Sequence, residues 1–121
     1  DVLYGVKDVN GHSAIMTPFT NVANPDFGKI RSAGFDKYFY EKFTDTLERY
    51  YPGRKVMKIW RQGISTGIFI PEFHGRDHIT VQLWLERLTE GDEVLRTAFE
   101  NGVVAMRVPG TPRQGIEFRP E

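Results

Sequence analysis

The chain has no cysteine, no net charge and no long apolar run, and each absence excludes a class of protein. Without cysteine there is no disulfide framework and no thiolate metal site, which leaves imidazole and carboxylate as the strong metal ligands. Sixteen basic residues balance sixteen acidic ones, so no overall field attracts nucleic acid or an anionic membrane. No apolar run approaches the roughly 20 residues that cross a bilayer. Neutral partners such as saccharides fit this composition better, and the lack of a signal-like segment favours a cytoplasmic location.

What is present is typical of a folded domain. Apolar residues make up 40% of the chain and charged residues 26%. The 121 residues can form one hydrophobic core but not two ordinary ones, so a single globular unit is expected over 1–121. The chain opens at Asp1 without a methionine, which predicts that further sequence precedes it.

Apolar patterns predict that strands and helices alternate along the chain. Short apolar stretches predict strands at 12–21, 68–73 and 103–108. Apolar residues at helical spacing, with capping and breaking residues, predict helices at 1–9, 24–34, 36–50, 56–64, 81–88 and 94–99, the second of them capped by Asn24. The Pro- and Gly-rich residues 109–121 are expected to be an extended tail.

This order predicts an α/β fold with about three parallel strands and covering helices. In such folds the functional groups gather beyond the carboxyl ends of the strands. Three strands are few for a parallel sheet that is covered on both faces, so the chain is expected to be a segment of a larger barrel or sheet. Its exposed strand edges would then favour assembly into a homo-oligomer.

The most distinctive polar stretch is HGRDH, residues 74–78, which directly follows the strand predicted at 68–73. Two histidines with three residues between them can face the same side of the backbone, and neutral imidazoles suit zinc. Gly75 favours a turn over a regular helix here. The spacing makes His74 and His78 candidates for two ligands of a divalent metal, and the alternative is a pair of polar residues on a solvated loop.

Other residues have both a functional and a structural interpretation. Arg76 could bind a substrate oxygen, but pairing with Glu72 or Asp77 is favoured. Asp77 could equally cap the next helix or act in the site. Three residues at the end of the first predicted strand are candidates for lining a substrate: Thr17, Thr20 and Asn21. Structural roles are expected for His12 in an exposed turn and for Trp60, Trp84, Phe39 and Phe43 in the core.

The order AIMTPF, a helix ending near GISTG, and then IFIPEFHGRDH resembles the second and third strand units of NodB-type polysaccharide deacetylases. More closely, VANPDFGKIRSAGF, FYEKFTDTL, FHGRDHITVQLWLERL and GDEVLRTAF resemble a bacterial polysaccharide-deacetylase-like subgroup, over roughly 10–102. In the family, two histidines at this spacing bind a divalent metal, usually zinc. The resemblance therefore implies that His74 and His78 are metal ligands. Gly75 replaces the family's Ser or Thr, and Ile79 replaces its Pro.

The family's other motifs have no counterpart in this chain. They are an Asp-Asp pair that supplies the base and the third metal ligand, an arginine motif and a general-acid histidine. The resemblance thus implies an interior segment, from strand 2 to about strand 4, of a metal-dependent deacetylase-like barrel. The parent protein would remove N- or O-acetyl groups from a saccharide, while this segment alone would be inactive and could lack metal. The alternative is a non-catalytic carbohydrate-binding or interaction module with a degenerate deacetylase fold.

Overall fold

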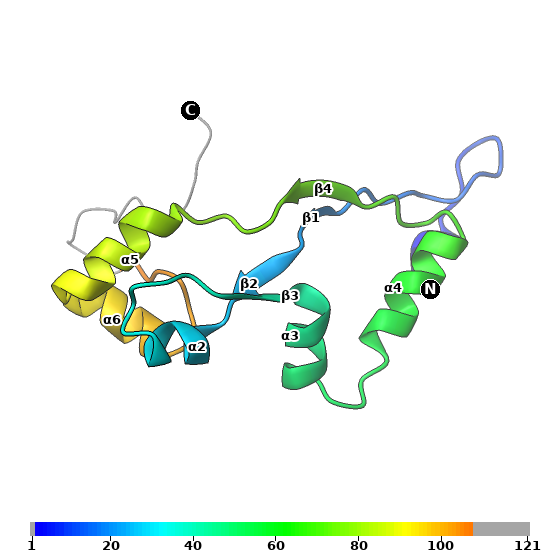
Figure 1. Ribbon diagram of the computed structural model, residues 1–121. Coiled ribbons are helices and arrows are strands. Elements are labelled where there is room, and N and C mark those ends of the chain that lie inside the picture. Colours follow the sequence, from blue (N-terminus) through cyan, green and yellow to red (C-terminus); the bar gives the residue numbers. More distant parts are fainter. Residues whose placement is uncertain (1, 108–121) are drawn as a thin grey trace. The chain divides into compact units, whose positions relative to one another are not determined.

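The computed structural model describes residues 2–107, and its contacts divide the chain into two compact units. Of the described residues, the first unit comprises 2–22 and 42–75, and the second comprises 23–41 and 76–107. Figure 1 labels most of their helices and strands. No helix within the described part of the chain is both long enough and apolar enough to cross a bilayer.

The first unit contains three helices and a pair of parallel strands. Its elements are α1 (Val2–Gly5), β1 (Phe19–Asn21), α3 (Phe43–Tyr50), α4 (Val56–Ser65) and β4 (Glu72–Gly75). β1 pairs with β4 in parallel, with Phe19 opposite Glu72 and Asn21 opposite Gly75. An isolated parallel bridge between Met16 and Phe69 extends the pairing toward the amino ends. The parallel arrangement of the first two predicted strands is therefore confirmed.

The second unit is built mainly of helices. Its elements are β2 (Ala23–Pro25), α2 (Phe27–Ser32), β3 (Tyr40–Lys42, whose last residue belongs to the first unit), α5 (Val81–Glu90) and α6 (Glu93–Glu100). β2 and β3 form a second two-stranded sheet. The described residues are thus mixed α/β, as predicted, with two small sheets in place of one sheet of three strands. A continuous barrel sheet stays a prediction, as does the single domain.

Turn and capping residues account for the helix ends that were predicted well. Gly67, just after α4, and Gly91, the C-cap of α5, both have positive φ, which glycine adopts without steric cost. The Asp92 side chain accepts hydrogen bonds from the backbone N–H groups of Val94 and Leu95 and so caps α6. These local signals lie in the sequence itself.

Several predicted elements were wrong in place or type. The strand predicted at 68–73 is β4 at 72–75, so His74 lies on the strand and not after it, and the helix predicted at 1–9 ends at Gly5.

Asn24 and Pro25 belong to β2, so Asn24 does not cap α2. The cap is Asp26, whose side chain accepts a hydrogen bond from the Lys29 N–H. The helix predicted at 36–50 begins only at Phe43, since the Phe39 carbonyl accepts a hydrogen bond from the Asp26 N–H and residues 40–42 are extended.

The strand predicted at 103–108 is not present in 103–107. There the Val104 carbonyl accepts a hydrogen bond from the indole Nε1 of Trp84 at 2.9 Å. The last residue of that prediction, like the tail predicted at 109–121, lies outside the described residues.

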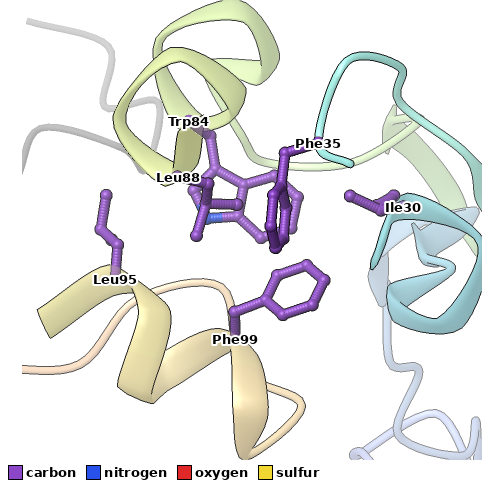
Figure 2. Packing of buried hydrophobic residues seen from close by; sticks show 6 residues of the cluster. All are labelled: Ile30, Phe35, Trp84, Leu88, Leu95 and Phe99. Atoms are coloured by element: carbon purple, nitrogen blue, oxygen red, sulfur yellow. The ribbon is translucent and has the colours of Figure 1, made fainter. Parts of the chain in front are cut away.

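The hydrophobic core lies in the second unit (Figure 2). Trp84 and Leu88 from α5 and Leu95 and Phe99 from α6 are almost fully buried together with Ile30 and Phe35. The ring of Phe99 packs edge-on against Phe35 and tilted against Trp84, with centroids 5.2 and 5.7 Å apart. The core role predicted for Trp84 is confirmed, and Phe39 packs against the same cluster.

The first unit buries far less apolar surface. Ile68 is its one buried side chain among the described residues. Trp60 lies between the rings of Phe43 and Phe69, at centroid distances of 6.0 and 5.8 Å. Phe69 presses so closely on α4 that a Cβ at Gly63 would lie 2.3 Å from its ring.

Candidate functional site

The carboxyl ends of β1 and β4 carry several of the predicted site residues. Because the two strands are parallel neighbours, their carboxyl ends meet at one edge of the sheet. Thr20 and Asn21 end β1, and His74 lies on β4, exposed, with its ring 6.1 Å from that of Phe19. Thr17 is exposed and precedes β1.

Asn21 has an unusual polar environment. Its Oδ1 atom is buried and has no hydrogen-bond partner among residues 2–107. The neighbouring Thr20 hydroxyl is satisfied locally, because it donates to the Pro18 carbonyl at 3.0 Å. A buried acceptor without a donor is costly, so the amide oxygen of Asn21 could accept a hydrogen bond from a group that residues 2–107 do not supply.

The two predicted metal ligands fall in different units. His74 belongs to the first unit, and His78, half-buried, belongs to the second. Among the residues that the structure describes, no three His, Asp or Glu side chains gather as a metal ion would need. The described residues alone therefore do not form a complete metal centre.

Arg76 and Asp77 join two tyrosines in a polar cluster within the second unit. Asp77 Oδ2 accepts hydrogen bonds from Arg76 Nε at 2.7 Å and from the Tyr38 hydroxyl at 2.8 Å. The Arg76 guanidinium lies 5.1 Å from the Tyr38 ring centroid and 5.2 Å from that of Tyr40. Tyr38 also packs edge-on against Trp84, which ties the cluster to the core. We call Arg76, Asp77, Tyr38 and Tyr40 the arginine–tyrosine cluster.

Burial explains the electrostatics of this cluster. The Asp77 side chain is only 8% exposed, and a buried carboxylate needs a charged partner and further hydrogen bonds. Burial, followed by the hydrogen bond to Asp77, raises the pKa of Tyr38 well above its usual range. The hydrogen bond to Asp77 likewise raises the pKa of Arg76. Tyr38 is therefore a neutral donor and Arg76 a permanent cation throughout the physiological pH range.

The structure shows the partners of Arg76 and Asp77 and adds two tyrosines to them, while a substrate-binding role for either residue stays a prediction. Arg76 pairs with Asp77, as favoured from the sequence. Asp77 does not cap α5, because the N-cap is Thr80, which makes no side-chain capping bond. Neither tyrosine was predicted at the site, and Tyr40 was assigned to a helix. No local signal could have found them, since they precede Asp77 by more than 35 positions, as the printed sequence shows.

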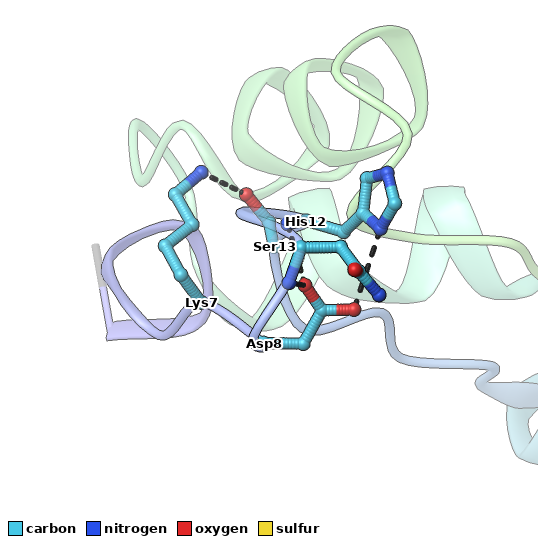
Figure 3. A network of polar contacts seen from close by, with 5 residues as sticks. Lys7, Asp8, His12 and Ser13 are labelled. Carbon is cyan, nitrogen blue, oxygen red and sulfur yellow. Dashed lines mark hydrogen bonds and ion pairs between the residues drawn. The ribbon is translucent and has the colours of Figure 1, made fainter.

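His12 has the structural role predicted for it (Figure 3). It lies in an exposed turn, where its Nδ1 atom is 3.3 Å from Asp8 Oδ2. The backbone N–H groups of Asn10 and His12 donate to the other Asp8 oxygen, and Lys7 Nζ donates to the Ser13 hydroxyl. The hydrogen bonds, that from the His12 N–H first, lower the pKa of Asp8.

Two hollows in the surface do not involve the predicted site residues. One, of about 370 Å³, lies in the second unit and is lined by Phe35, Asp36, Gln82, Leu85, Glu86, Thr89 and Glu90. The other, of about 410 Å³, lies in the first unit and is mainly apolar, lined by residues of α1 and α4 with Ile68 and Phe69.

No known family, curated protein or solved structure matches the chain. Membership of the deacetylase family is therefore a prediction from the sequence motifs.

Proposed function

We propose that this chain is part of a deacetylase-like hydrolase that acts on N- or O-acetyl groups of a saccharide. The observation that carries the proposal is the parallel pairing of β1 and β4, which brings Thr20, Asn21 and His74 to one sheet edge. The deacetylase resemblance predicts such a strand pair, with polar residues after both strands. The buried, unsatisfied oxygen of Asn21 at this edge could accept a hydrogen bond from a hydroxyl or amide of a bound sugar.

The proposal assigns different tasks to this chain and to its surroundings. His74 and His78 are proposed as two imidazole ligands of zinc, on the basis of their spacing and the resemblance. The third ligand, the general base and the general acid would come from outside the 121 residues. Thr17, Thr20 and Asn21 would line the saccharide. On an N-acetylated substrate the overall reaction breaks the amide C–N bond, consumes one water and releases acetate and the free amine.

Zinc titration into the longest natural form of the protein tests the ligand assignment. We expect His74→Ala combined with His78→Ala to weaken zinc binding beyond the roughly 10- to 100-fold typical of losing an outer-shell partner. His12→Ala is the matched control, because His12 is an exposed histidine held only by Asp8, and we expect zinc affinity to be unchanged. Isothermal titration calorimetry measures all three proteins.

Release of acetate from N-acetylated oligosaccharides tests the reaction itself. Acetate release by the natural protein that is lost in the double histidine variant supports the proposal. A natural protein that neither binds zinc nor releases acetate contradicts it, as does zinc binding that the double substitution leaves unchanged. Saccharide binding without zinc binding or hydrolysis would favour the non-catalytic module instead.

A further inference from the structure

The arginine–tyrosine cluster presents guanidinium donors that its internal contacts do not use, together with the partly exposed ring of Tyr40. Arg76 donates its Nε–H to Asp77, and its Nη groups form no hydrogen bond with the described residues. The Nη groups carry the remaining donors of a guanidinium. The Arg76 side chain is 48% exposed, and Tyr40 is 54% exposed. Both groups can therefore be reached from solvent.

The guanidinium of Arg76 is held in place before any ligand arrives. Asp77 fixes its Nε edge, while the rings of Tyr38 and Tyr40 lie at nearly equal distances from its central carbon. Asp77 is itself held by the Tyr38 hydroxyl, and Tyr38 packs on the buried Trp84. A ligand that binds Arg76 thus avoids much of the entropy cost of ordering a long side chain.

The Nη edge of the Arg76 guanidinium, which Asp77 does not occupy, determines which kind of ligand can bind. A guanidinium binds a carboxylate through two parallel N–H···O bonds, and the pair of Nη groups provides such an edge when Nε is occupied. The Arg76 guanidinium lies over the ring of Tyr40, which is 54% exposed and so still offers apolar ring surface to the C–H groups of a sugar. A ligand that combines a carboxylate and a sugar ring in one unit is a uronic acid.

We infer that Arg76 and Tyr40 form a binding subsite for a uronic acid residue of an acidic saccharide. Arg76 binds the carboxylate through its Nη edge, and Tyr40 supports the sugar ring. Asp77 and Tyr38 act as positioning residues because they hold the guanidinium. The inference rests on the proposed function in taking the ligand to be a saccharide, but it requires neither metal nor hydrolysis.

Binding of glucuronic acid oligosaccharides, measured with a chelator present, tests the inference apart from the zinc chemistry. The probes are an unacetylated glucuronate oligomer and the same oligomer with its carboxylates converted to methyl esters. We expect the protein to bind the acid roughly tenfold or more tightly than the ester, because the ester loses the charge-assisted bonds. Arg76→Lys should reduce this preference, since lysine keeps the charge but loses the planar pair of donors.

Two further variants separate a binding role from a structural one. Tyr40→Ala should weaken binding of the acid and of the ester to a similar extent, about five- to tenfold for one lost aromatic face. Arg54→Lys is the matched control, because Arg54 also lies over a tyrosine ring, that of Tyr51, and should leave binding unchanged. Circular dichroism confirms that each variant is folded.

Equal affinity for acid and ester, or a preference that Arg76→Lys leaves undiminished, would overturn the inference. Absence of binding by the natural protein to either probe would do the same. Because the probes carry no acetyl group and the chelator removes zinc, these outcomes leave the hydrolase proposal standing. Conversely, if the natural protein does not bind zinc, the proposed uronic acid subsite is not contradicted.

Discussion

The two units differ sharply in how much apolar surface they bury. The second unit encloses a cluster of six buried side chains around Trp84 and Phe99. In the first unit Phe19 and Phe73, on the paired strands, are 73% and 72% exposed. Hydrophobic burial is the main favourable term in folding, so most of the stability belongs to the second unit. The first unit holds a parallel strand pair that is poorly covered, an arrangement that proteins rarely leave facing water.

Replacing the tryptophan of each unit by alanine should give the largest difference between the units in lost free energy of unfolding. We expect Trp84→Ala to lower the free energy of unfolding by about 3–5 kcal/mol, the usual cost of deleting a buried aromatic ring. Trp60→Ala should cost clearly less, because Trp60 is only partly buried between Phe43 and Phe69. Urea unfolding followed by circular dichroism, with amide hydrogen exchange to resolve the units, measures both. Equal losses would contradict the contrast in burial.

A charge on the exposed strand pair tests whether that surface drives self-association, which remains a prediction. If Phe19 becomes buried between copies, Phe19→Lys removes roughly 1.5–3 kcal/mol of favourable burial and weakens assembly about ten- to a hundredfold. Val103→Lys, at an exposed apolar residue of the second unit, is the control and should have little effect. Sedimentation equilibrium measures the association constant. A natural protein that is monomeric at all concentrations would refute the prediction.

Helix capping offers a smaller test of the same contrast. Asp92→Ala removes the side chain that accepts from the Val94 and Leu95 N–H groups, and should cost about 1 kcal/mol. Lys55 occupies the N-cap position of α4 in the first unit but makes no side-chain capping bond. Lys55→Ala should therefore leave the free energy of unfolding nearly unchanged. Chemical denaturation measures the free energy of unfolding of both variants. Equal losses would show that the side-chain cap of α6 adds no stability beyond that of the uncapped position at α4.

The smallest effect is expected at high pH, through Tyr38. Burial raises the pKa of Tyr38 in the folded chain above its value of about 10 in the unfolded chain. Its contribution to stability is complete below about pH 10, and it is lost as the pH rises further, because only the unfolded chain then releases the proton readily. We expect Tyr38→Phe to flatten the fall in stability above pH 10, while Tyr50→Phe, at an exposed tyrosine of the first unit, does not. Unfolding curves between pH 8 and 11 test this, and identical profiles would contradict it.

Helix prediction succeeded where the signals are local. The apolar spacing of Trp84 and Leu88 and the residues Gly91 and Asp92 locate α5 and α6 closely. Prediction failed at 36–50, where the Phe39 carbonyl is bonded to the distant Asp26 N–H and residues 40–42 become a strand. Periodicity alone contains no information about such a partner.

At the candidate sites, too, contacts between neighbouring residues were predictable and contacts between distant residues were not. The pairing of Arg76 with Asp77 joins neighbouring residues, and the sequence predicted it as one of two possible pairings. The ligand role of His74 and His78 stays a prediction from their spacing. Tyr38 and Tyr40 enter the cluster only through the packing of 23–41 with 76–107 inside the second unit.

The sequence by itself determined the composition class, the helices α4, α5 and α6, and the order of the first two strands, because these depend on residues a few positions apart. Only the tertiary structure decided which strands pair, which unit holds the core and which side chains surround Arg76. Those outcomes depend on contacts between residues far apart in the chain, where burial and hydrogen bonding outweigh local preference.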